Sequence, residues 1–147
     1  MTINFLDVHA DLILDMLKDL PITIELVTTF ANKNLEELKS YIKKNEKVTL
    51  YIDANNIADI IRECDIALVT PSVMVNEIIF LKIPFISIMV TENQYYMDTF
   101  LRQEGFPCTN STNLHLLPSL IKSFYDKDYY MKQLDQINNI TKKRIHK

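Results

Sequence analysis

The sequence predicts a three-layer α/β/α, Rossmann-like domain with a mainly parallel sheet, and three observations support this fold class. Short runs rich in β-branched residues alternate with longer amphipathic segments, which is typical of strands and helices in turn. The run IALV at residues 66–69 is wholly apolar, as expected for a strand covered on both faces. Strands joined by connections of helix length pair in parallel, through right-handed crossovers.

Local signals place the individual elements. Pro21 ends the first helix, Asn34 caps the second and Pro84 closes a later one. Gly105 is well placed to follow a helix in left-handed geometry. We expect strands at residues 2–5, 22–28, 48–52, 66–69, 85–90 and 106–108. Helices are expected at residues 6–20, 35–44, 73–81, 95–104, 113–125 and 128–145, with a short one that ends near Cys64.

The chain of 147 residues, 48% of them hydrophobic, is expected to form a single domain over residues 1–147, closed by helices at about 113–147. A net charge of −3 argues against a general nucleic-acid binder. No apolar run approaches the roughly 18 residues of a membrane span, and no signal peptide is recognised. Two distant cysteines, Cys64 and Cys108, indicate a reduced, cytoplasmic chain.

Glycine is almost absent from this sequence. Gly105 is the only one, although average usage of about 7% would give roughly ten. Walker-type and GxGxxG phosphate loops need several glycines, because the backbone must approach phosphate closely. The chain is therefore neither a P-loop enzyme nor an ordinary dinucleotide-binding domain, and no cofactor is expected.

The best candidate for an anion-binding site follows the apolar run at residues 66–69. There a strand leads through a short turn into a helix, whose first amides and positive dipole end can hold an anion without a lysine. Ser72 is a good N-cap, and a carboxylate a turn and a half later can accept hydrogen bonds from a diol. The candidate nucleotide-binding residues are Thr70, Ser72, Val73, Met74 and Glu77. The simpler alternative is a helix cap followed by an exposed glutamate.

A second polar segment, residues 91–94 (TENQ), follows the next strand. Side chains such as Asn93 and Gln94 at the carboxyl end of a strand can bind the hydroxyls of a sugar. The alternative is a helix cap that faces solvent.

Several stretches match one known family in the right order. The chain resembles the C-terminal half of the PseG-like UDP-2,4-diacetamido-2,4,6-trideoxy-β-L-altropyranose hydrolases, which belong to the glycosyltransferase-B structural group. The resemblance covers roughly residues 1–110. The matching stretches are Asn34-Leu35-Glu36-Glu37-Leu38, residues 51–58 (YIDANNIA), residues 64–68 (CDIAL), Val75-Asn76-Glu77, residues 81–84 (LKIP) and Glu92-Asn93-Gln94.

The resemblance implies a site for UDP or a UDP-sugar. In this family the glutamate that matches Glu77 binds ribose hydroxyls, amides at the start of its helix hold the diphosphate, and the residues that match Asn93 and Gln94 face the sugar. The implied reaction is inverting attack of water at the anomeric carbon, in pseudaminic or sialic-acid-type polysaccharide biosynthesis. The family's catalytic histidine belongs to an N-terminal half that this sequence does not contain.

The sequence also departs from the family. Phe5-Leu6 stands where a glycine pair is usual, although Asp7 matches the next position. The glycine-serine run before the nucleotide helix has become Pro71-Ser72-Val73, and Pro71 lacks an amide. We therefore name no catalytic residue and expect no catalysis by this chain alone. Two alternatives stay open: a non-enzymatic interaction module that kept the fold, and a half-domain of a nucleotide-sugar glycosyltransferase.

The remaining candidates are interpreted structurally. His9, His115 and His146 lack metal-ligand spacing and are expected at the surface, so no metal site is proposed. Neither cysteine has a neighbouring base that would make it a nucleophile. An apolar stripe on the last predicted helix either covers the chain's own sheet or joins a second copy. Partners considered are UDP or a UDP-sugar, an N-terminal-half protein and self-association.

Overall fold

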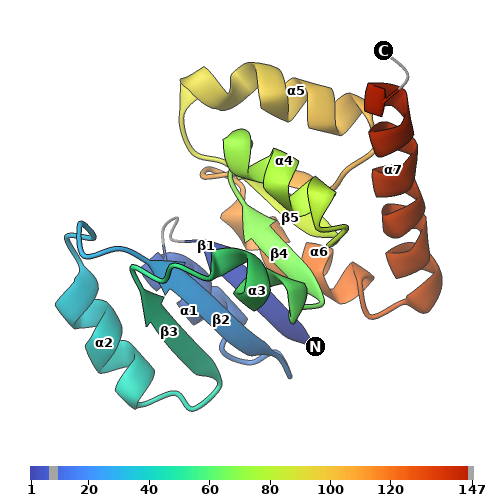
Figure 1. The fold of residues 1–147 in the computed structure, drawn as a ribbon. Coiled ribbons are helices and arrows are strands. Elements are labelled where there is room, and N and C mark those ends of the chain that lie inside the picture. The colour runs from blue at the N-terminus through green and yellow to red at the C-terminus, as the bar shows by residue number, and fades with distance from the viewer. Residues whose placement is uncertain (7–9, 146–147) are drawn as a thin grey trace.

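The protein folds around one parallel sheet, as seen in a computed structural model that describes residues 1–6 and 10–145 (Figure 1). Its six strands lie in the order β3-β2-β1-β4-β5-β6, and every neighbouring pair is parallel. The strands are β1 (Thr2–Leu6), β2 (Thr23–Thr28), β3 (Val48–Ile52), β4 (Ile66–Val69), β5 (Phe85–Met89) and β6 (Cys108–Asn110). The predicted fold class is confirmed.

Helices cover both faces of the sheet. On one face, α1 (Ala10–Leu17), α2 (Leu35–Lys43) and α6 (Leu117–Ser123) pack against even-numbered strand residues such as Ile24 and Leu68. On the other face, α3 (Ile57–Arg62), α4 (Val73–Phe80), α5 (Tyr95–Gln103) and α7 (Lys127–Ile145) surround odd-numbered residues such as Val69 and Phe85. All four residues of β4 are buried, as its apolar sequence predicts.

The apolar stripe on the last helix packs against the chain's own core. Of the two roles considered for this stripe, covering the chain's own sheet or joining a second copy, the structure shows the first. Ile137 and Ile140 are buried against α4 and α5, and Tyr129 and Tyr130 pack on the opposite core. The hydroxyl of Tyr130 donates a hydrogen bond to the backbone oxygen of Asp65 (2.7 Å). Figure 1 shows α7 running along one side of the sheet, close to the ends of α4 and α5.

Several predicted boundaries were wrong. Leu6 belongs to β1, and the first helix, Ala10–Leu17, ends three residues earlier than predicted. The last strand is Cys108–Asn110, because Pro107 offers only its carbonyl oxygen, which accepts from the Ser87 amide. The helix expected over residues 113–125 divides into the 3-10 turn η2 (Leu114–Leu116) and α6. Gly105 has φ +86°, the left-handed geometry predicted for it.

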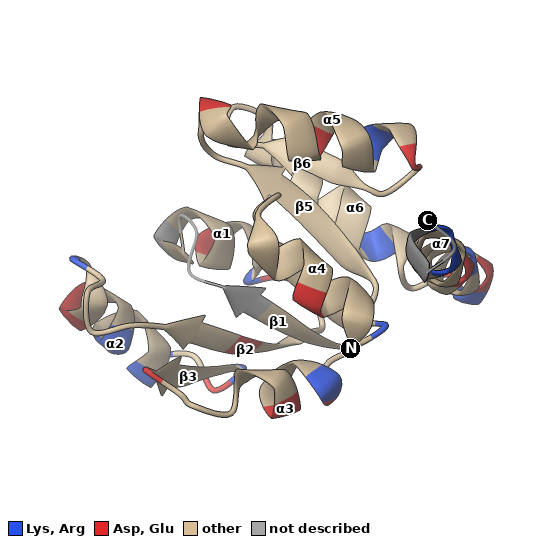
Figure 2. Cartoon of the chain, turned by 45° about the horizontal axis from the view of Figure 1, so that its top comes forward, with Lys and Arg blue, Asp and Glu red and all other residues tan. Residues whose placement is uncertain are grey.

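Charge is carried mainly by the outer surfaces of the helices (Figure 2). α4 carries little charge, because Glu77 is the single charged residue in its sequence VMVNEIIF. A helix this apolar is normally covered on most sides. The exposed side chains of α4 therefore include two large apolar groups, Val73 and Phe80, which are 75% and 79% exposed.

Candidate functional site

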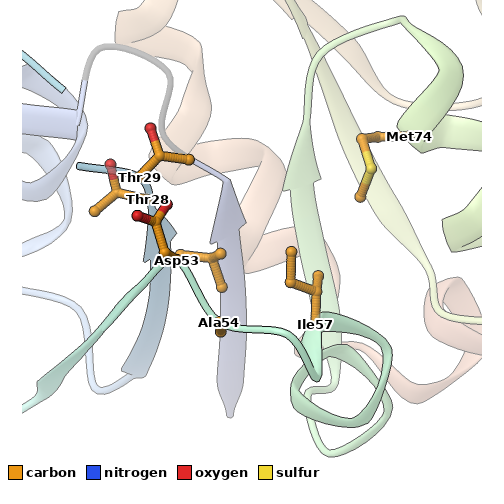
Figure 3. Close-up of a pocket in the computed structure, with 7 residues that line it drawn as sticks. Thr28, Thr29, Asp53, Ala54, Ile57 and Met74 are labelled. Carbon is orange, nitrogen blue, oxygen red and sulfur yellow. The ribbon is translucent and has the colours of Figure 1, made fainter. Parts of the chain in front are cut away.

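The carboxyl edge of the sheet carries the largest cavity described here, with a volume of about 470 Å³. Thr28 and Thr29 at the end of β2, the loop after β3 and the first turns of α3 and α4 surround it, with Asp53, Ala54, Ile57 and Met74 as lining residues. Figure 3 shows Thr28, Thr29 and Asp53 grouped on one side and Ile57 and Met74 on the other. The cavity thus has a polar wall and an apolar wall.

Strand register brings the polar wall together. Thr28 pairs with Ile52 in the β2–β3 ladder, so Asp53 follows directly beside the end of β2. The Asp53 amide donates to the Thr28 carbonyl oxygen (2.9 Å), and its carboxylate accepts from the Phe30 amide (3.4 Å). Asp53 has φ +50°, a left-handed conformation that Asp tolerates better than most residues. In the sequence, Asp53 stands out only as part of the stretch at residues 51–58 that matches the family, and it was not predicted as a site residue.

The start of α4 offers backbone amides at the same edge. Ser72 is the N-cap residue, as predicted, but its hydroxyl lies 3.2 Å from that of Thr70 and does not cap the helix. The Val75 amide donates to the Ser72 carbonyl oxygen (3.0 Å). Among the described residues, none accepts a hydrogen bond from the amides of Val73 or Met74. These two donors, at the positive end of the helix, remain available for an anion.

Glu77 follows Met74 by one helical turn, on the side of α4 that faces α3. It lines a second cavity of about 330 Å³, together with Ala58 and Arg62 of α3 and Phe80. Ile57 and Met74 line the first cavity, whereas Ala58 and Glu77, which follow them on α3 and α4, line the second. The Glu77 side chain is exposed. It lies one helical turn after Met74, whose side chain lines the first cavity and whose amide is one of the two available donors.

In the second predicted segment, residues 91–94, the polar side chains form hydrogen bonds within their own turn. The carboxamide oxygen of Gln94 accepts hydrogen bonds from the amides of Val90 (2.9 Å) and Thr91 (3.4 Å). The Thr91 hydroxyl donates to the Asn93 side chain. Both predicted sugar-side residues thus help to hold the turn η1 (Glu92–Gln94), and Asn93 is exposed whereas Gln94 is half-buried.

Neither cysteine is suited to nucleophilic chemistry. Burial raises the pKa of Cys64 to about 12, and burial followed by the nearby Asp98 carboxylate does the same for Cys108. His115 is exposed, as expected, whereas Asp7, His9 and His146 lie outside the described residues. In the described part of the chain, His, Cys, Asp and Glu side chains form no group of three or more that could hold a metal ion. No helix described here is long and apolar enough to cross a bilayer.

The fold is that of a Rossmann-like domain, and it resembles one half of solved glycosyltransferases. The glycosyltransferase WaaG, involved in lipopolysaccharide biosynthesis, superposes with a TM-score of 0.67 over 95% of this chain and 42% of its own, at 13% identity. The spinosyn rhamnosyltransferase SpnG superposes with a TM-score of 0.66 over 93% of this chain and 41% of its own, at 11% identity. At such identities these likenesses show the fold alone.

A relative found by sequence similarity gives a more specific comparison than the shared fold does. Over 98 residues, 65% of this chain, the protein is 33% identical to the UDP-2,4-diacetamido-2,4,6-trideoxy-β-L-altropyranose hydrolase of Campylobacter jejuni subsp. jejuni serotype O:2 (strain ATCC 700819 / NCTC 11168). This match confirms the resemblance inferred from the sequence. The aligned part spans 36% of the length of that hydrolase. No family model matches the chain.

Proposed function

We propose that this chain binds a UDP-sugar at the carboxyl edge of its sheet, as the nucleotide-binding half of a sugar-nucleotide hydrolase of pseudaminic or sialic-acid-type glycan biosynthesis. The observation that carries the proposal is the arrangement of Met74 and Glu77. They lie one turn apart on α4, where Met74 lines the cavity of about 470 Å³ and Glu77 lines the cavity of about 330 Å³, and two available helix amides lie at the start of the same helix.

The proposed binding mode follows from these groups. The amides of Val73 and Met74, with the dipole of α4 behind them, hold the diphosphate. Glu77 accepts hydrogen bonds from the two ribose hydroxyls, since an ionised carboxylate only accepts. The base enters the cavity of about 470 Å³ between Asp53 and Ile57, where it has one polar and one apolar wall. Thr70 and Ser72, whose hydroxyls are in contact, border the phosphates.

The proposed reaction is hydrolysis with inversion. A water oxygen forms a bond to the anomeric carbon, the bond from that carbon to the β-phosphate oxygen breaks, and UDP leaves with the electron pair. The proton of the water passes to a general base. We assign that base to a second domain or polypeptide that faces this edge, and we expect no turnover from the described residues alone. The two free cysteines, of which Cys64 is buried and Cys108 half-buried, support action in the cytoplasm.

Titration with UDP, UMP and ADP by calorimetry tests the proposal. Glu77→Ala is expected to weaken UDP binding by about 1.5–3 kcal/mol, the range for hydrogen bonds to a charged group. Glu37→Ala is the control, because Glu37 is an exposed glutamate of α2 on the opposite face of the sheet. UDP is also expected to shift the amide resonances of residues 72–77. Unchanged resonances at millimolar UDP would contradict the proposal.

A second role is favoured by exposed apolar groups at the carboxyl edge. Phe30 after β2 and Val73 at the start of α4 are 70% and 75% exposed. Apolar surface of this kind is commonly covered by a partner, here either a second domain, a separate N-terminal-half protein or another copy. A non-enzymatic interaction module would keep this surface without binding UDP. Sedimentation measurements with and without UDP separate the two: a strict monomer that binds UDP excludes the module.

A half-domain of a glycosyltransferase is the remaining alternative, consistent with the fold shared with WaaG and SpnG. It would use the same nucleotide site, because hydrolase and transferase differ in what attacks the anomeric carbon. Water gives a free sugar, whereas an acceptor hydroxyl gives a glycoside. Product analysis by mass spectrometry, with the complete assembly and a UDP-sugar, distinguishes the two reactions.

A further inference from the structure

The sheet ends on one side in β3, an edge strand without the features that normally keep edge strands apart (Figure 1). Its sequence, VTLYI, is rich in residues that favour strands and contains no charged residue, proline or glycine. Native proteins usually blunt an exposed edge with lysine, proline, a bulge or a very short strand. The opposite edge is of that kind, because β6 has only three residues and the Thr109 hydroxyl donates to the Asn113 carbonyl oxygen beside it (2.9 Å).

The outer side of β3 carries unpaired backbone groups. The Lys47 carbonyl oxygen accepts from an amide of β2 (2.8 Å), and the Asp53 amide donates to a carbonyl oxygen of β2 (2.9 Å). In a parallel pair alternate residues bond to the same neighbour, so the odd-numbered residues of this segment face β2. The amides and carbonyl oxygens of Leu50 and Ile52 point away from the sheet. Among the described residues, none accepts a hydrogen bond from either of these two amides.

A second copy of β3 fits this edge in the antiparallel direction. With a two-fold axis at Leu50, the outward amide and carbonyl oxygen of this residue meet the same groups of the second copy and form two hydrogen bonds. Ile52 and Val48 of the two copies form the next hydrogen-bonded pairs on either side. The complete set of residues that then lie opposite one another is Lys47 with Asp53, Val48 with Ile52, Thr49 with Tyr51 and Leu50 with itself. The strand is thus complementary to its own reverse.

Lys47 and Asp53 favour this register over its neighbours. Both side chains are exposed, and neither forms an ion pair within the described part of the chain. With the axis at Leu50, the ammonium group of each copy meets the carboxylate of the other at both ends of the paired strands. An axis one residue earlier places Lys47 opposite Tyr51, and an axis one residue later places Asp53 opposite Thr49. Either shift loses both charge pairs.

We propose that this chain forms a two-fold symmetric dimer through antiparallel pairing of β3, which joins two sheets into one continuous sheet. Thr49 of each copy packs beside Tyr51 of the other, a pairing of β-branched and aromatic side chains that stabilises antiparallel strands. The axis is perpendicular to the sheet, so the two carboxyl edges face opposite ends of the dimer. Each carboxyl edge stays open, and the inference therefore does not rest on the proposed function.

Sedimentation over a series of protein concentrations tests the dimer, and the unmodified chain is expected to show a monomer–dimer equilibrium. Lys47→Glu is expected to raise the dissociation constant of the dimer at least about tenfold, because two attractive charge pairs become repulsive. Lys132→Glu makes the same charge change on an exposed lysine of α7 and is the control that keeps the dimer. Leu50→Pro removes an outward amide, which an edge strand tolerates, and is expected to abolish the dimer. Circular dichroism of each variant verifies its fold.

Amide hydrogen exchange identifies the surface that pairs. The amides of Leu50 and Ile52 are expected to be protected at high protein concentration and to exchange freely on dilution or in Lys47→Glu. A chain that stays monomeric at millimolar concentration overturns the inference, as does an unchanged dissociation constant in Lys47→Glu. A dimer in which these two amides exchange freely also overturns it, since that dimer uses another surface. Calorimetry with UDP measures the nucleotide site separately, so the failure of either proposal leaves the other in place.

Discussion

The carboxamide oxygen of Gln94 accepts a hydrogen bond from the backbone amide of Val90, at 2.9 Å. This contact closes the turn after β5. The same oxygen also accepts from the Thr91 amide (3.4 Å), and the Thr91 side chain accepts from the Gln94 amide, which together form a capping box. Gln94 therefore positions the loop that carries Glu92 and Tyr95. Any effect of Gln94 on sugar binding is expected to act through the shape of this loop.

Replacing Gln94 by Ala is expected to lower the free energy of unfolding by about 0.5–1.5 kcal/mol, because the half-buried Val90 amide loses its acceptor. Gln94→Glu is the matched control, since a carboxylate accepts the same bonds and is expected to stay close to the original stability. Urea denaturation, followed by circular dichroism, measures both variants. Equal loss in the two variants would show that the acceptor is not what stabilises the turn.

Lys82 follows α4 with φ +61°, a conformation that costs a side-chain-bearing residue about 1 kcal/mol. Its ammonium group donates to the Asn138 side chain of α7 (2.6 Å). Lys82→Ala keeps the backbone strain and loses this contact, whereas Lys82→Gly loses the contact and relieves the strain. The glycine variant is thus expected to be more stable than the alanine variant by about 1 kcal/mol, measured as the difference in urea denaturation. The reverse order would contradict the strained backbone.

Most of the fold follows from local patterns in the sequence. The apolar run of β4 and the Ser72 position before α4 place Glu77 on a helix at the carboxyl edge, as predicted. The polar wall of the cavity of about 470 Å³ is not predicted by local patterns, because Thr28 and Asp53 meet only through the register of β2 and β3. No short-range pattern encodes that register.

The direction in which a side chain points is the second feature of the site that the sequence does not predict. In the sequence, Gln94 and Asn93 are indistinguishable from solvent-facing polar residues, and nothing local shows that the Gln94 carboxamide turns back to Val90. Ser72 illustrates the same point, since its position was predicted but its hydroxyl contacts Thr70 and not a helix amide. The strand at residues 106–108 was placed too early because Pro107 contributes only an acceptor to the ladder.

Asp53 combines a left-handed backbone with a side-chain acceptor for the Phe30 amide. Asp53→Asn is expected to retain the original stability within about 0.5 kcal/mol, because Asn also tolerates this conformation and offers a carbonyl oxygen. Asp53→Ala is expected to cost about 1–2 kcal/mol, since it keeps the backbone cost and loses the acceptor. Thermal denaturation of the two variants, side by side, gives the comparison. An alanine variant as stable as the asparagine variant would contradict this account of the cavity wall.

The buried thiol of Cys64 and the half-buried thiol of Cys108 make the stability of the fold sensitive to alkaline pH. Burial raises the pKa of Cys64 and of Cys108 to about 12 in the folded state, whereas exposed thiols titrate near 8.5. Below the unfolded pKa both states hold these protons, so stability does not depend on them. Between about pH 8.5 and pH 12 the unfolded chain ionises and the folded chain does not, so the free energy of unfolding is expected to fall as pH rises. Urea titrations at pH 8 and pH 10 measure the fall, and Cys64→Ala with Cys108→Ala is expected to reduce it. A disulfide-exchange reagent at pH 8 is expected to label both thiols rapidly in urea, and in the folded protein to label the buried Cys64 more slowly than the half-buried Cys108. Rapid labelling of the folded chain would show that the thiols are not protected by burial.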